Sequence, residues 1–431
     1  MKLWDKGITI DQKIEQFTVG NDRDIDMHIA KYDVQASLAH AKMLRKINIL
    51  TDDEWKQLEE GLLGLQEQIK NGSFQIEEQF EDIHSKIEFE LTQKYGDVGK
   101  KIHTARSRND QVLVALSLYY KENILNVKSK TATLFDTLLK LAETHKNQLI
   151  PGYTHLQVAM PSSFGLWFSA YAELLIDDVY FLDAALKVVD QNPLGSAAGY
   201  GSSFSIDREF TTQELHFATL KYNVVAAQMS RGKNERSIAS ALGGLSNTLA
   251  RFSMDICLYM SQNFGFISFP DALTTGSSIM PHKKNPDVFE LIRGKCNKIQ
   301  ALYTEMLLIT NNLPSGYHRD FQLLKEHMFA AFEEIKNILD IFDFAIRQII
   351  VKEVDLTDDK YKFIFTVDAM NSLVESGMTY RDAYKEIGAK VESDSFQYDA
   401  NKTHTHTGSI HNLALDKIRE KFEKGTLKNE A

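Results

Sequence analysis

The stretch 275–287, T-G-S-S-I-M-P-H-K-K-N-P-D, contains the residues whose types and spacing are best suited to chemistry. Gly276 allows close approach of the backbone to a ligand, because glycine has no Cβ. Lys283 and Lys284 place two cations within a few residues of the serine hydroxyls, a composition suited to binding carboxylates or phosphates. The asparagine–proline pair that follows predicts the start of a helix, with asparagine as N-cap. We therefore expect an anion site beside a positive helix end.

Ser277 is a candidate catalytic base. No Gly-x-Ser-x-Gly motif surrounds Ser277 and Ser278, which argues against a nucleophile for acyl transfer. A serine near Lys283 and a helix N-terminus could instead be ionised. Such an alkoxide suits the removal of a proton next to a carboxylate, where the developing charge needs cations and amides around it. An ordinary polar loop is the alternative that the residue types leave open.

Two further polar segments offer candidate groups. His155 follows Pro151-Gly152-Tyr153-Thr154 in a predicted turn before a helix, and it could act as a general acid or base because histidine titrates near neutral pH. A loop histidine bonded to backbone is the alternative. Arg106, Arg108 and Asn109 could bind a carboxylate, or they could cap the following helix and form salt bridges with it.

Two other motifs are expected to be inert. The glycines at 195, 199 and 201 lack both the G-x-G-x-x-G spacing and a preceding strand, so nucleotide binding is not predicted. The histidines at 404, 406 and 411 lie in a threonine-rich loop with no carboxylate nearby in sequence. They are predicted to be exposed to solvent rather than to bind a metal.

Composition excludes several classes of protein. The chain has 431 residues, a net charge of −10 and a pI near 5.8, which argues against a nucleic-acid binder. The two cysteines, Cys257 and Cys296, are too few for a disulfide framework; we expect both to be buried and the compartment to be reducing. Neither a signal peptide nor a run of about 18 apolar residues is present, so a cytoplasmic protein without a membrane span is expected.

Proline placement and apolar periodicity predict a mainly α protein. All seven prolines fall between positions 151 and 314, and proline breaks helix interiors. Thr51 and Glu54 form a predicted capping box. Long uninterrupted helical patterns are predicted at 112–150, 162–190, 232–263, 286–311 and 321–350. Helices of this length suggest assembly of several chains through a shared helical core.

With these residues in view, the chain resembles the aspartase/fumarase superfamily. The signature G-S-x-x-M-x-x-K-x-N stands at 276–285. The segments 106–111 (R-S-R-N-D-Q), 151–157 (P-G-Y-T-H-L-Q) and 281–290 (P-H-K-K-N-P-D-V-F-E) make the resemblance closest to the argininosuccinate lyase branch. The likeness extends from about residue 20 to 390.

The resemblance implies a three-domain fold, with an N-terminal helical domain at 1–107, a central long-helix domain at 108–355 and a small C-terminal domain at 356–431. It implies a homotetramer with a twenty-helix core and active sites shared between three subunits. The implied reaction is the reversible cleavage of argininosuccinate to arginine and fumarate in arginine biosynthesis, with no cofactor and no metal. Neither nucleic acid nor membrane is an expected partner.

The resemblance also implies residue roles. Ser277 corresponds to the base, His155 to the proton donor or its relay, and Glu290 to the carboxylate that orients this histidine. Lys283 and Asn285 correspond to groups that stabilise the intermediate. The remaining matches to substrate-binding positions are Asn109, Arg108, Thr154, Tyr317, Gln322, Lys325 and Arg236.

Three positions depart from the family pattern. Ala105 stands where glycine is usual, His282 where glutamine is common, and Asp22 where a serine commonly contacts substrate. An acid at position 22 could meet the guanidinium or amino end of the substrate. Two other functions remain open: a sister lyase that releases fumarate from another substituted succinate, and a non-catalytic, crystallin-like member of the fold. Retention of Ser277 and His155 disfavours the second.

Overall fold

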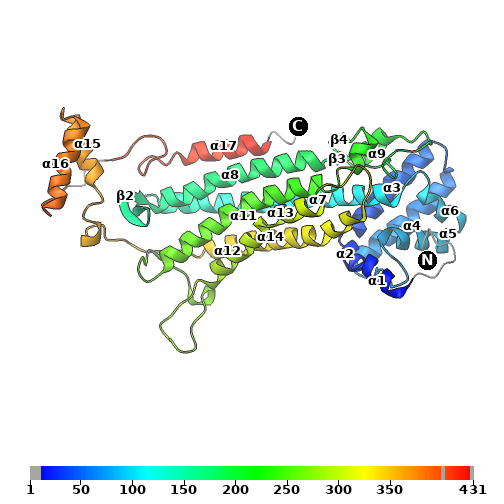
Figure 1. The fold of residues 1–431 in the computed structure, drawn as a ribbon, viewed down its shortest axis with the longest axis horizontal. Helices are drawn as coiled ribbons and strands as arrows, with labels where there is room; N and C mark the ends of the chain where they lie inside the picture. The colour runs from blue at the N-terminus through cyan, green and yellow to red at the C-terminus, as the bar shows by residue number, and fades with distance from the viewer. Residues whose placement is uncertain (1–10, 399–402, 428–431) are drawn as a thin grey trace. The chain divides into compact units, whose positions relative to one another are not determined.

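The computed structural model describes residues 11–398 and 403–427, and this part of the chain is mainly helical (Figure 1). The α-helices are α1 (Gln12–Val19), α2 (Asp22–Asp26), α3 (Ala30–Lys46), α4 (Asp52–Lys70), α5 (Ile83–Tyr95), α6 (Asp97–Lys100), α7 (Arg108–Thr144), α8 (Phe164–Val189), α9 (Arg208–Glu214), α10 (Val224–Gln228), α11 (Lys233–Met260), α12 (Asp287–Gln300), α13 (Leu302–Ile309), α14 (Leu324–Ile346), α15 (Thr366–Glu375), α16 (Tyr380–Glu392) and α17 (Leu415–Leu427). Short 3-10 helices are η1 (Lys101–His103), η2 (Asp271–Leu273), η3 (Arg319–Leu323) and η4 (Asp359–Tyr361).

Within the described residues, six short strands pair in three two-stranded sheets. Antiparallel pairs are β1 (Leu149–Thr154) with β2 (Gln157–Ser163) and β5 (Ile267–Ser268) with β6 (Ile350–Val351). The parallel pair is β3 (Gln191–Asn192) with β4 (Thr219–Leu220). These strands connect helices and build no layer of their own, which agrees with the predicted mainly α class.

The chain divides into two compact units. Unit 1 comprises Met1–Lys128, Phe181–Gly244 and Lys298–Lys336, and unit 2 comprises Ser129–Tyr180, Leu245–Asn297 and Asn337–Ala431. The longest helices contribute to both units because the boundaries fall within them. The three domains expected from the sequence stay a prediction.

Local signals explain several helix boundaries. The capping box predicted at Thr51 is present: its hydroxyl accepts from the Glu54 amide at 3.2 Å, and the Glu54 carboxylate accepts from the Thr51 amide at 2.9 Å. Two orphan amides at the start of α4 are thereby satisfied. The four long patterns that begin at 112, 162, 232 and 321 are confirmed as α7, α8, α11 and α14, but α7 ends at Thr144, before β1, and α14 spans only Leu324–Ile346, between η3 and β6.

The pattern at 286–311 was expected to form one helix, and this prediction is wrong. It forms α12 and α13, which are interrupted at Ala301. The Ala301 amide donates to Lys298 O at 3.2 Å, three residues back, so the backbone tightens from α-helical to 3-10 spacing at this point. No proline or glycine marks the break in the sequence.

Aromatic side chains pack the core of unit 1 between its helical segments. The rings of Tyr119 on α7 and Phe332 on α14 lie edge to face with centroids 5.9 Å apart. The Tyr120 hydroxyl donates to the buried carboxylate of Glu235 on α11 at 3.1 Å. These contacts hold α7, α11 and α14 together within unit 1 and satisfy a polar group that burial would otherwise penalise.

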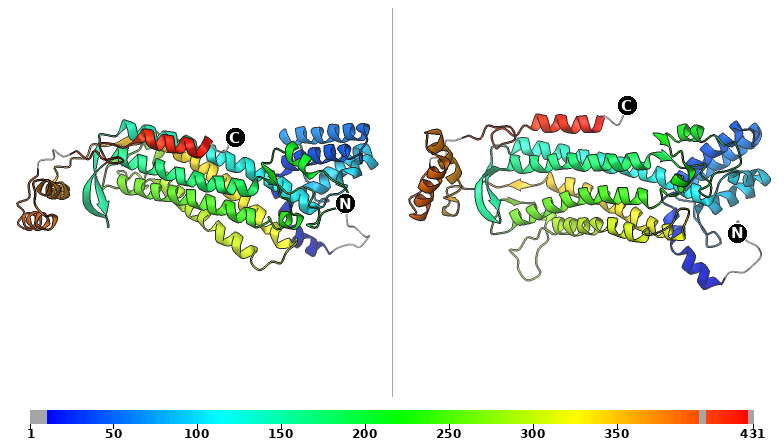
Figure 2. Two further views of the ribbon diagram at one scale, coloured as in Figure 1. Left: turned by 90° about the horizontal axis from the view of Figure 1, so that it is seen from above. Right: turned by 45° about the horizontal axis from the view of Figure 1, so that its top comes forward.

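Unit 2 has its own aromatic core, and its segments of α8, α11 and α14 run alongside one another in both further views (Figure 2). Tyr171 on α8 stacks on Phe252 on α11 with ring centroids 4.0 Å apart. Phe342 on α14 contacts Phe252 at 5.1 Å. Phe422 on α17 stacks on Phe135 on α7 at 4.0 Å. The C-terminal helix α17 is therefore part of the packing of this unit.

Predictions about membrane-spanning helices and about the burial of the two cysteines also come from the sequence. In the described part of the chain, no helix combines the length and apolar character needed to cross a membrane. Cys296 is buried as expected, whereas Cys257 is only half-buried.

Candidate active site

The 275–287 segment forms a loop in unit 2 that closes on itself. Thr275 and Asn285 form an isolated β-bridge, in which the Asn285 amide donates to Thr275 O at 2.9 Å. The Asn285 side-chain amide lies 3.4 Å from Gly276 O. The Thr275 hydroxyl donates to the Asp287 carboxylate. These contacts fix the two ends of the loop and leave its centre exposed.

Ser277 lies at the base of this exposed centre and is half-buried. Its Oγ accepts from the amides of Met280 at 3.1 Å and Ile279 at 3.3 Å. Amide donors aimed at an oxygen favour its ionised form and stabilise negative charge there. The geometry therefore supports a serine that can lose its proton.

The two lysines of the loop differ in their surroundings. Lys284 forms an ion pair with Asp271. Lys283 is exposed, and within the described residues its ammonium group has no acidic partner. Lys283 is therefore the cation that remains available to a ligand.

The helix that follows begins one residue later than predicted, so the expected Asn285 cap is wrong. Pro286 O accepts from the Glu290 amide at 3.0 Å, which gives Pro286 the N-cap position of α12. Asn285 instead bonds within the loop. Asp287 and Glu290 occupy the first turn, where their charges offset the positive helix end. Glu290 is exposed.

Thr154 and His155 lie at the tip of a β-hairpin in unit 2, where the sequence had suggested a plain turn. Thr154 pairs with Gln157, so His155 and Leu156 form a two-residue connection with φ values of 54° and 58°. Two consecutive positive φ values are typical of a type I′ turn, a position that usually favours asparagine and glycine. The hairpin thus holds an exposed histidine in a strained conformation, as functional sites often do.

Unit 1 contains a pocket that brings together five of the predicted substrate-binding residues. They are Arg108, Asn109, Tyr317, Gln322 and Lys325. Val19, Asp22, Asp26, Glu81, Asp82, Val112, Arg231 and Arg319 complete its lining. The first helical turn of α7 and the segment 317–325 supply the predicted residues, although they are far apart in the sequence.

Lys325 is buried in this pocket between two acids. Its Nζ lies 2.6 Å from Asp26 Oδ1 and 2.8 Å from Asp22 Oδ1. Burial raises the pKa of Asp22, Lys325 lowers it and Asp26 raises it, with a net rise. One ammonium group thus pairs with two carboxylates in surroundings that hold little water. The stability of each carboxylate's negative charge therefore depends strongly on this ammonium group.

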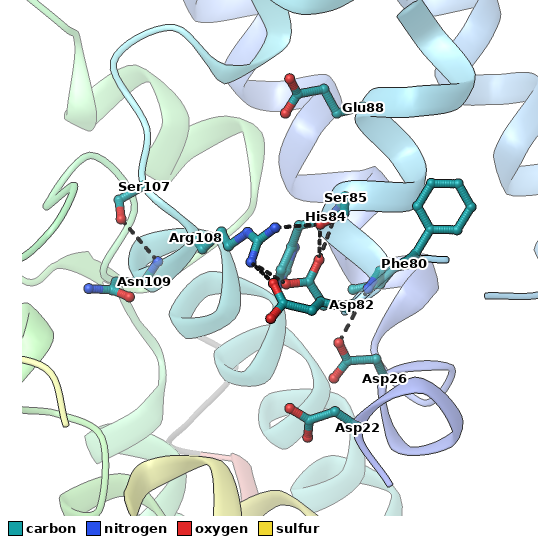
Figure 3. A network of polar contacts seen from close by, with 12 residues as sticks. Asp22, Asp26, Phe80, Asp82, His84, Ser85, Glu88, Ser107, Arg108 and Asn109 are labelled. Atoms are coloured by element: carbon teal, nitrogen blue, oxygen red, sulfur yellow. Dashed lines mark hydrogen bonds and ion pairs between the residues drawn. The ribbon is translucent and has the colours of Figure 1, made fainter. Parts of the chain in front are cut away.

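Arg108 is held by the acids at the start of α5. Its Nη1 lies 2.8 Å from Glu81 Oε2 and 3.3 Å from Asp82 Oδ2, and its Nη2 donates to Ser85 Oγ at 2.6 Å. Figure 3 shows the guanidinium pointing toward Asp82 and Ser85, with Asn109 beside it on α7. Arg108 therefore combines the two roles that the sequence left open, since it is salt-bridged and also lines the pocket.

The remaining predictions fall outside this pocket. Arg236, on α11, donates from Nε to Gly232 O at 3.2 Å. The predicted exposure of the three histidines is confirmed for His406 and His411, whereas His404 is half-buried and its Nε2 lies 2.8 Å from an oxygen of the buried Asp368, a carboxylate distant in the sequence. The His411 ring accepts from the His404 amide at 3.0 Å. Within the described residues, no three histidine, cysteine or acidic side chains are grouped for metal binding.

The glycine-rich segment near 195 has a structural partner. Asp110, fully buried at the start of α7, accepts from the amides of Gly195 and Ala197, each at 3.0 Å. This carboxylate positions the segment beside α7; the expectation that the segment does not bind a nucleotide stays a prediction.

Several pocket residues were missed by reasoning from the sequence. They are Asp26, Glu81, Asp82, Arg231 and Arg319. The spacing of Asp22 and Asp26 gave a usable signal, because residues four apart share one face of a helix. For the others, the sequence pattern carried no comparable signal.

Comparison with known proteins places this geometry in context. A family model described as Lyase matches residues 6–301. A solved structure of EDDS lyase in complex with formate aligns with a TM-score of 0.72 at 21% identity, covering 98% of this chain and 87% of that one. Class II fumarase from Schistosoma mansoni aligns with a TM-score of 0.72 at 16% identity, covering 98% of both chains. Fold and family model together define the class, a lyase with the fumarase-type fold.

Closer relatives define the branch. Argininosuccinate lyase of Bacteroides fragilis is 53% identical over 417 residues, 97% of this chain and 93% of that protein. Argininosuccinate lyase of Thermotoga neapolitana is 41% identical over 389 residues, 90% of this chain and 98% of that protein. The chain belongs to the argininosuccinate lyase family.

Proposed function

We propose that this chain catalyses the reversible β-elimination of argininosuccinate to arginine and fumarate. The observation that carries the proposal is the Ser277 hydroxyl, which accepts from the Ile279 and Met280 amides. In the same loop Lys284 pairs with Asp271, whereas Lys283 has no acidic partner among the described residues. Family membership supplies the substrate. Neither a sister lyase nor a non-catalytic role is favoured by the names of the similar proteins.

The first step is removal of a proton from the succinyl Cβ, the carbon adjacent to the one that bears the guanidino nitrogen. Before the transfer, Ser277 Oγ is an alkoxide, and the two backbone amides that donate to it offset its negative charge. The alkoxide then takes the proton. The electrons move into the carboxylate, which becomes a doubly negative aci-carboxylate. Lys283 and Asn285 stabilise this intermediate, since one is an available cation and the other carries an amide next to Gly276.

The second step breaks the C–N bond. The guanidino nitrogen of arginine is a poor leaving group, so it must gain a proton as the bond breaks. His155 supplies that proton directly or through a relay, and Glu290 orients its ring. Fumarate retains the two carboxylates, and arginine leaves with the transferred proton.

The arginine end of the substrate binds in the unit 1 pocket. Asn109, Tyr317, Gln322 and Lys325 contact it, with Arg108 at the pocket wall. Thr154 and Arg236 add contacts from outside the pocket. The pocket supports this assignment because it carries both acids and bases, and argininosuccinate itself carries both charges.

We further propose a homotetramer, with a twenty-helix core and sites shared between subunits, in the cytoplasm. The long helices expose large apolar residues that suit a helical interface, among them Leu174 on α8, Met254 on α11, Leu291 on α12 and Phe344 on α14. The exposed tip at His155 also suits a group that acts on another chain's substrate.

Substitution of Ser277 tests the proposal. Ser277→Ala should lower kcat for fumarate release by about 10²–10⁴-fold, the usual contribution of a general base, and should still bind argininosuccinate. Ser278→Ala is the matched control, since its side chain is the exposed neighbour, and it should retain activity. Normal turnover by Ser277→Ala would refute the base assignment.

Subunit mixing tests the shared site. Ser277→Ala and His155→Asn proteins, each expected to have strongly reduced activity, should regain some activity when mixed under conditions of subunit exchange, because hybrids contain some sites with both groups intact. Demonstrated exchange without any recovery would contradict a site built from several chains.

A further inference from the structure

The β1–β2 hairpin lies at the start of α8, at one end of the unit 2 helices (Figure 2). His155, the proposed proton donor, is exposed at the tip of this hairpin, and within the described residues its ring has no hydrogen-bond partner. The neighbouring Leu156 is 70% exposed. A group that transfers a proton must be held close to its productive geometry. The hairpin itself must therefore hold His155 in place.

The backbone of this tip needs support from outside the turn. His155 and Leu156 have φ values of 54° and 58°, a region in which residues other than glycine are strained. Such a conformation persists only where the surrounding structure holds it. Two residue pairs of the ladder lie between this turn and the register shift that follows Pro151. A two-stranded ribbon of this length is marginal on its own, so the tip requires a further anchor.

The register shift determines the direction of Tyr153. Gly152 on β1 opposes two residues of β2, Ala159 and Met160, so the ladder contains a β-bulge immediately before Tyr153. A bulge bends the ladder and re-aims the side chains next to it. A Cβ on Gly152 would lie 2.9 Å from Met160 O, closer than ordinary van der Waals contact. Glycine at position 152 therefore permits the close approach of the two strands from which Tyr153 projects.

The Tyr153 ring packs against two aromatic rings of unit 2. It lies edge to face with Phe264 at a centroid distance of 5.2 Å, and its centroid is 6.4 Å from that of Phe266. Phe266 is buried, and both of its backbone groups are bonded: its amide donates to Tyr259 O at 2.9 Å, and its carbonyl accepts from the Lys352 amide at 2.9 Å. Tyr153 thus joins the hairpin tip to a fixed part of the core.

We propose that Tyr153 is a positioning residue, whose ring anchors the tip of the β1–β2 hairpin to unit 2 and so holds His155 where it can donate its proton. The inference rests on the proposed function, because it needs His155 to be the donor. Tyr153 acts through His155 and does not bind the substrate. Its loss misplaces a group needed in the transition state, whereas the substrate-binding residues of the unit 1 pocket stay intact. The effect therefore falls on kcat rather than on KM.

Tyr153→Leu tests the proposal, because leucine keeps an apolar side chain but removes both ring contacts. Its kcat for fumarate release should fall about 10- to 100-fold, the effect of displacing a catalytic group by about 1 Å. Its KM should stay within about threefold of the wild type. Tyr153→Phe is the matched control, since it keeps the ring and should keep kcat. Equal losses in the two variants, or a change in KM as large as that in kcat, would overturn the proposal.

A double variant tests whether Tyr153 acts through His155. Tyr153→Leu combined with His155→Asn should be no slower than His155→Asn alone, because the group that Tyr153 positions is already absent. If the two losses multiply, Tyr153 affects turnover by another route and the proposal is wrong.

Hydrogen exchange gives a measurement that does not depend on catalysis. Amides of residues 153–158 should exchange faster in Tyr153→Leu than in the wild type or in Tyr153→Phe, because the hairpin tip opens more often. Amides of α8 should exchange at wild-type rates. Unchanged exchange at 153–158, or an equal acceleration in α8, would contradict a local anchoring role.

Phe264→Leu gives a second test if Tyr153→Leu does not fold, because it removes a ring from the other side of the contact. The same loss of kcat at unchanged KM is expected, and a wild-type kcat would overturn the proposal. The proposed function is tested separately by the wild type. Absence of wild-type fumarate release refutes the reaction, whereas an altered kcat in a variant of an active enzyme concerns Tyr153 alone.

Discussion

Lys325 is the residue whose removal should most disturb unit 1. Lys325→Met keeps the length and apolar stem of the side chain but removes the ammonium group. The carboxylates of Asp22 and Asp26, each within 2.8 Å of that group, then lose the cation that contacts both. Asp26 is 1% exposed, so water replaces the lost partner poorly.

The expected cost follows from this burial. Breaking a buried ion pair by removing one partner typically costs about 3–5 kcal/mol, because an uncompensated charge remains. Lys42→Met is the matched control: Lys42 pairs with Glu214 at 2.7 Å, with side chains 44% and 30% exposed. Exposed pairs contribute about 0–1 kcal/mol. Two lysine-to-methionine changes in one unit should therefore differ severalfold in their effect.

The cost should also depend on pH, with a sign set by Asp22. Its pKa in the folded protein is already raised by burial and by Asp26, and Lys325 lowers it. Without Lys325 this pKa rises further. A carboxyl group with a raised pKa binds its proton more tightly when folded, so folding gains stability as pH falls through that pKa. The deficit of Lys325→Met should be largest near neutral pH and smaller at mildly acidic pH.

Urea unfolding followed by circular dichroism, at both pH values, measures this deficit. The double variant Lys325→Met/Asp22→Asn should recover part of the stability, because one of the two opposed charges is gone. A deficit no larger than that of Lys42→Met, or one that does not change with pH, would refute the reasoning from burial and charge.

Two other predictions concern the backbone. Ala105 has φ 61°, a conformation that costs a non-glycine residue about 1–2 kcal/mol. Glycine relieves this strain but has more conformational entropy in the unfolded chain. Ala105→Gly should therefore raise the free energy of unfolding by up to about 1 kcal/mol. Urea titration would contradict this if Ala105→Gly were less stable than the wild type. Thr51→Ala removes the cap of α4 and should cost about 1 kcal/mol, whereas Thr133→Ala, whose hydroxyl bonds within its own helix, should cost less; equal losses would argue against the cap.

The helices were largely predictable because their signals are local. The Thr51 capping box and the absence of proline after position 314 depend on neighbours in the chain. The β1–β2 hairpin was missed because its strands contain Pro151 and Gly152, which weaken any strand pattern. The break at Ala301 was also missed, since its cause is backbone geometry without a characteristic residue type.

The site was predictable where a motif carries it. One short signature contains Ser277, Lys283 and Asn285. Ala105 departs from the glycine usual at its position in the family, and its positive φ explains why glycine is favoured there. The acids of the unit 1 pocket were not predictable in this way. Asp26 binds Lys325 across 299 residues of sequence, and only folding brings the two together.

The central claim is the reaction itself, and product analysis of the purified protein with argininosuccinate tests it most directly. We predict equimolar fumarate and arginine, formed faster than any product from other substituted succinates in the same panel. Fumarate released from another substituted succinate, with none from argininosuccinate, would contradict the claim.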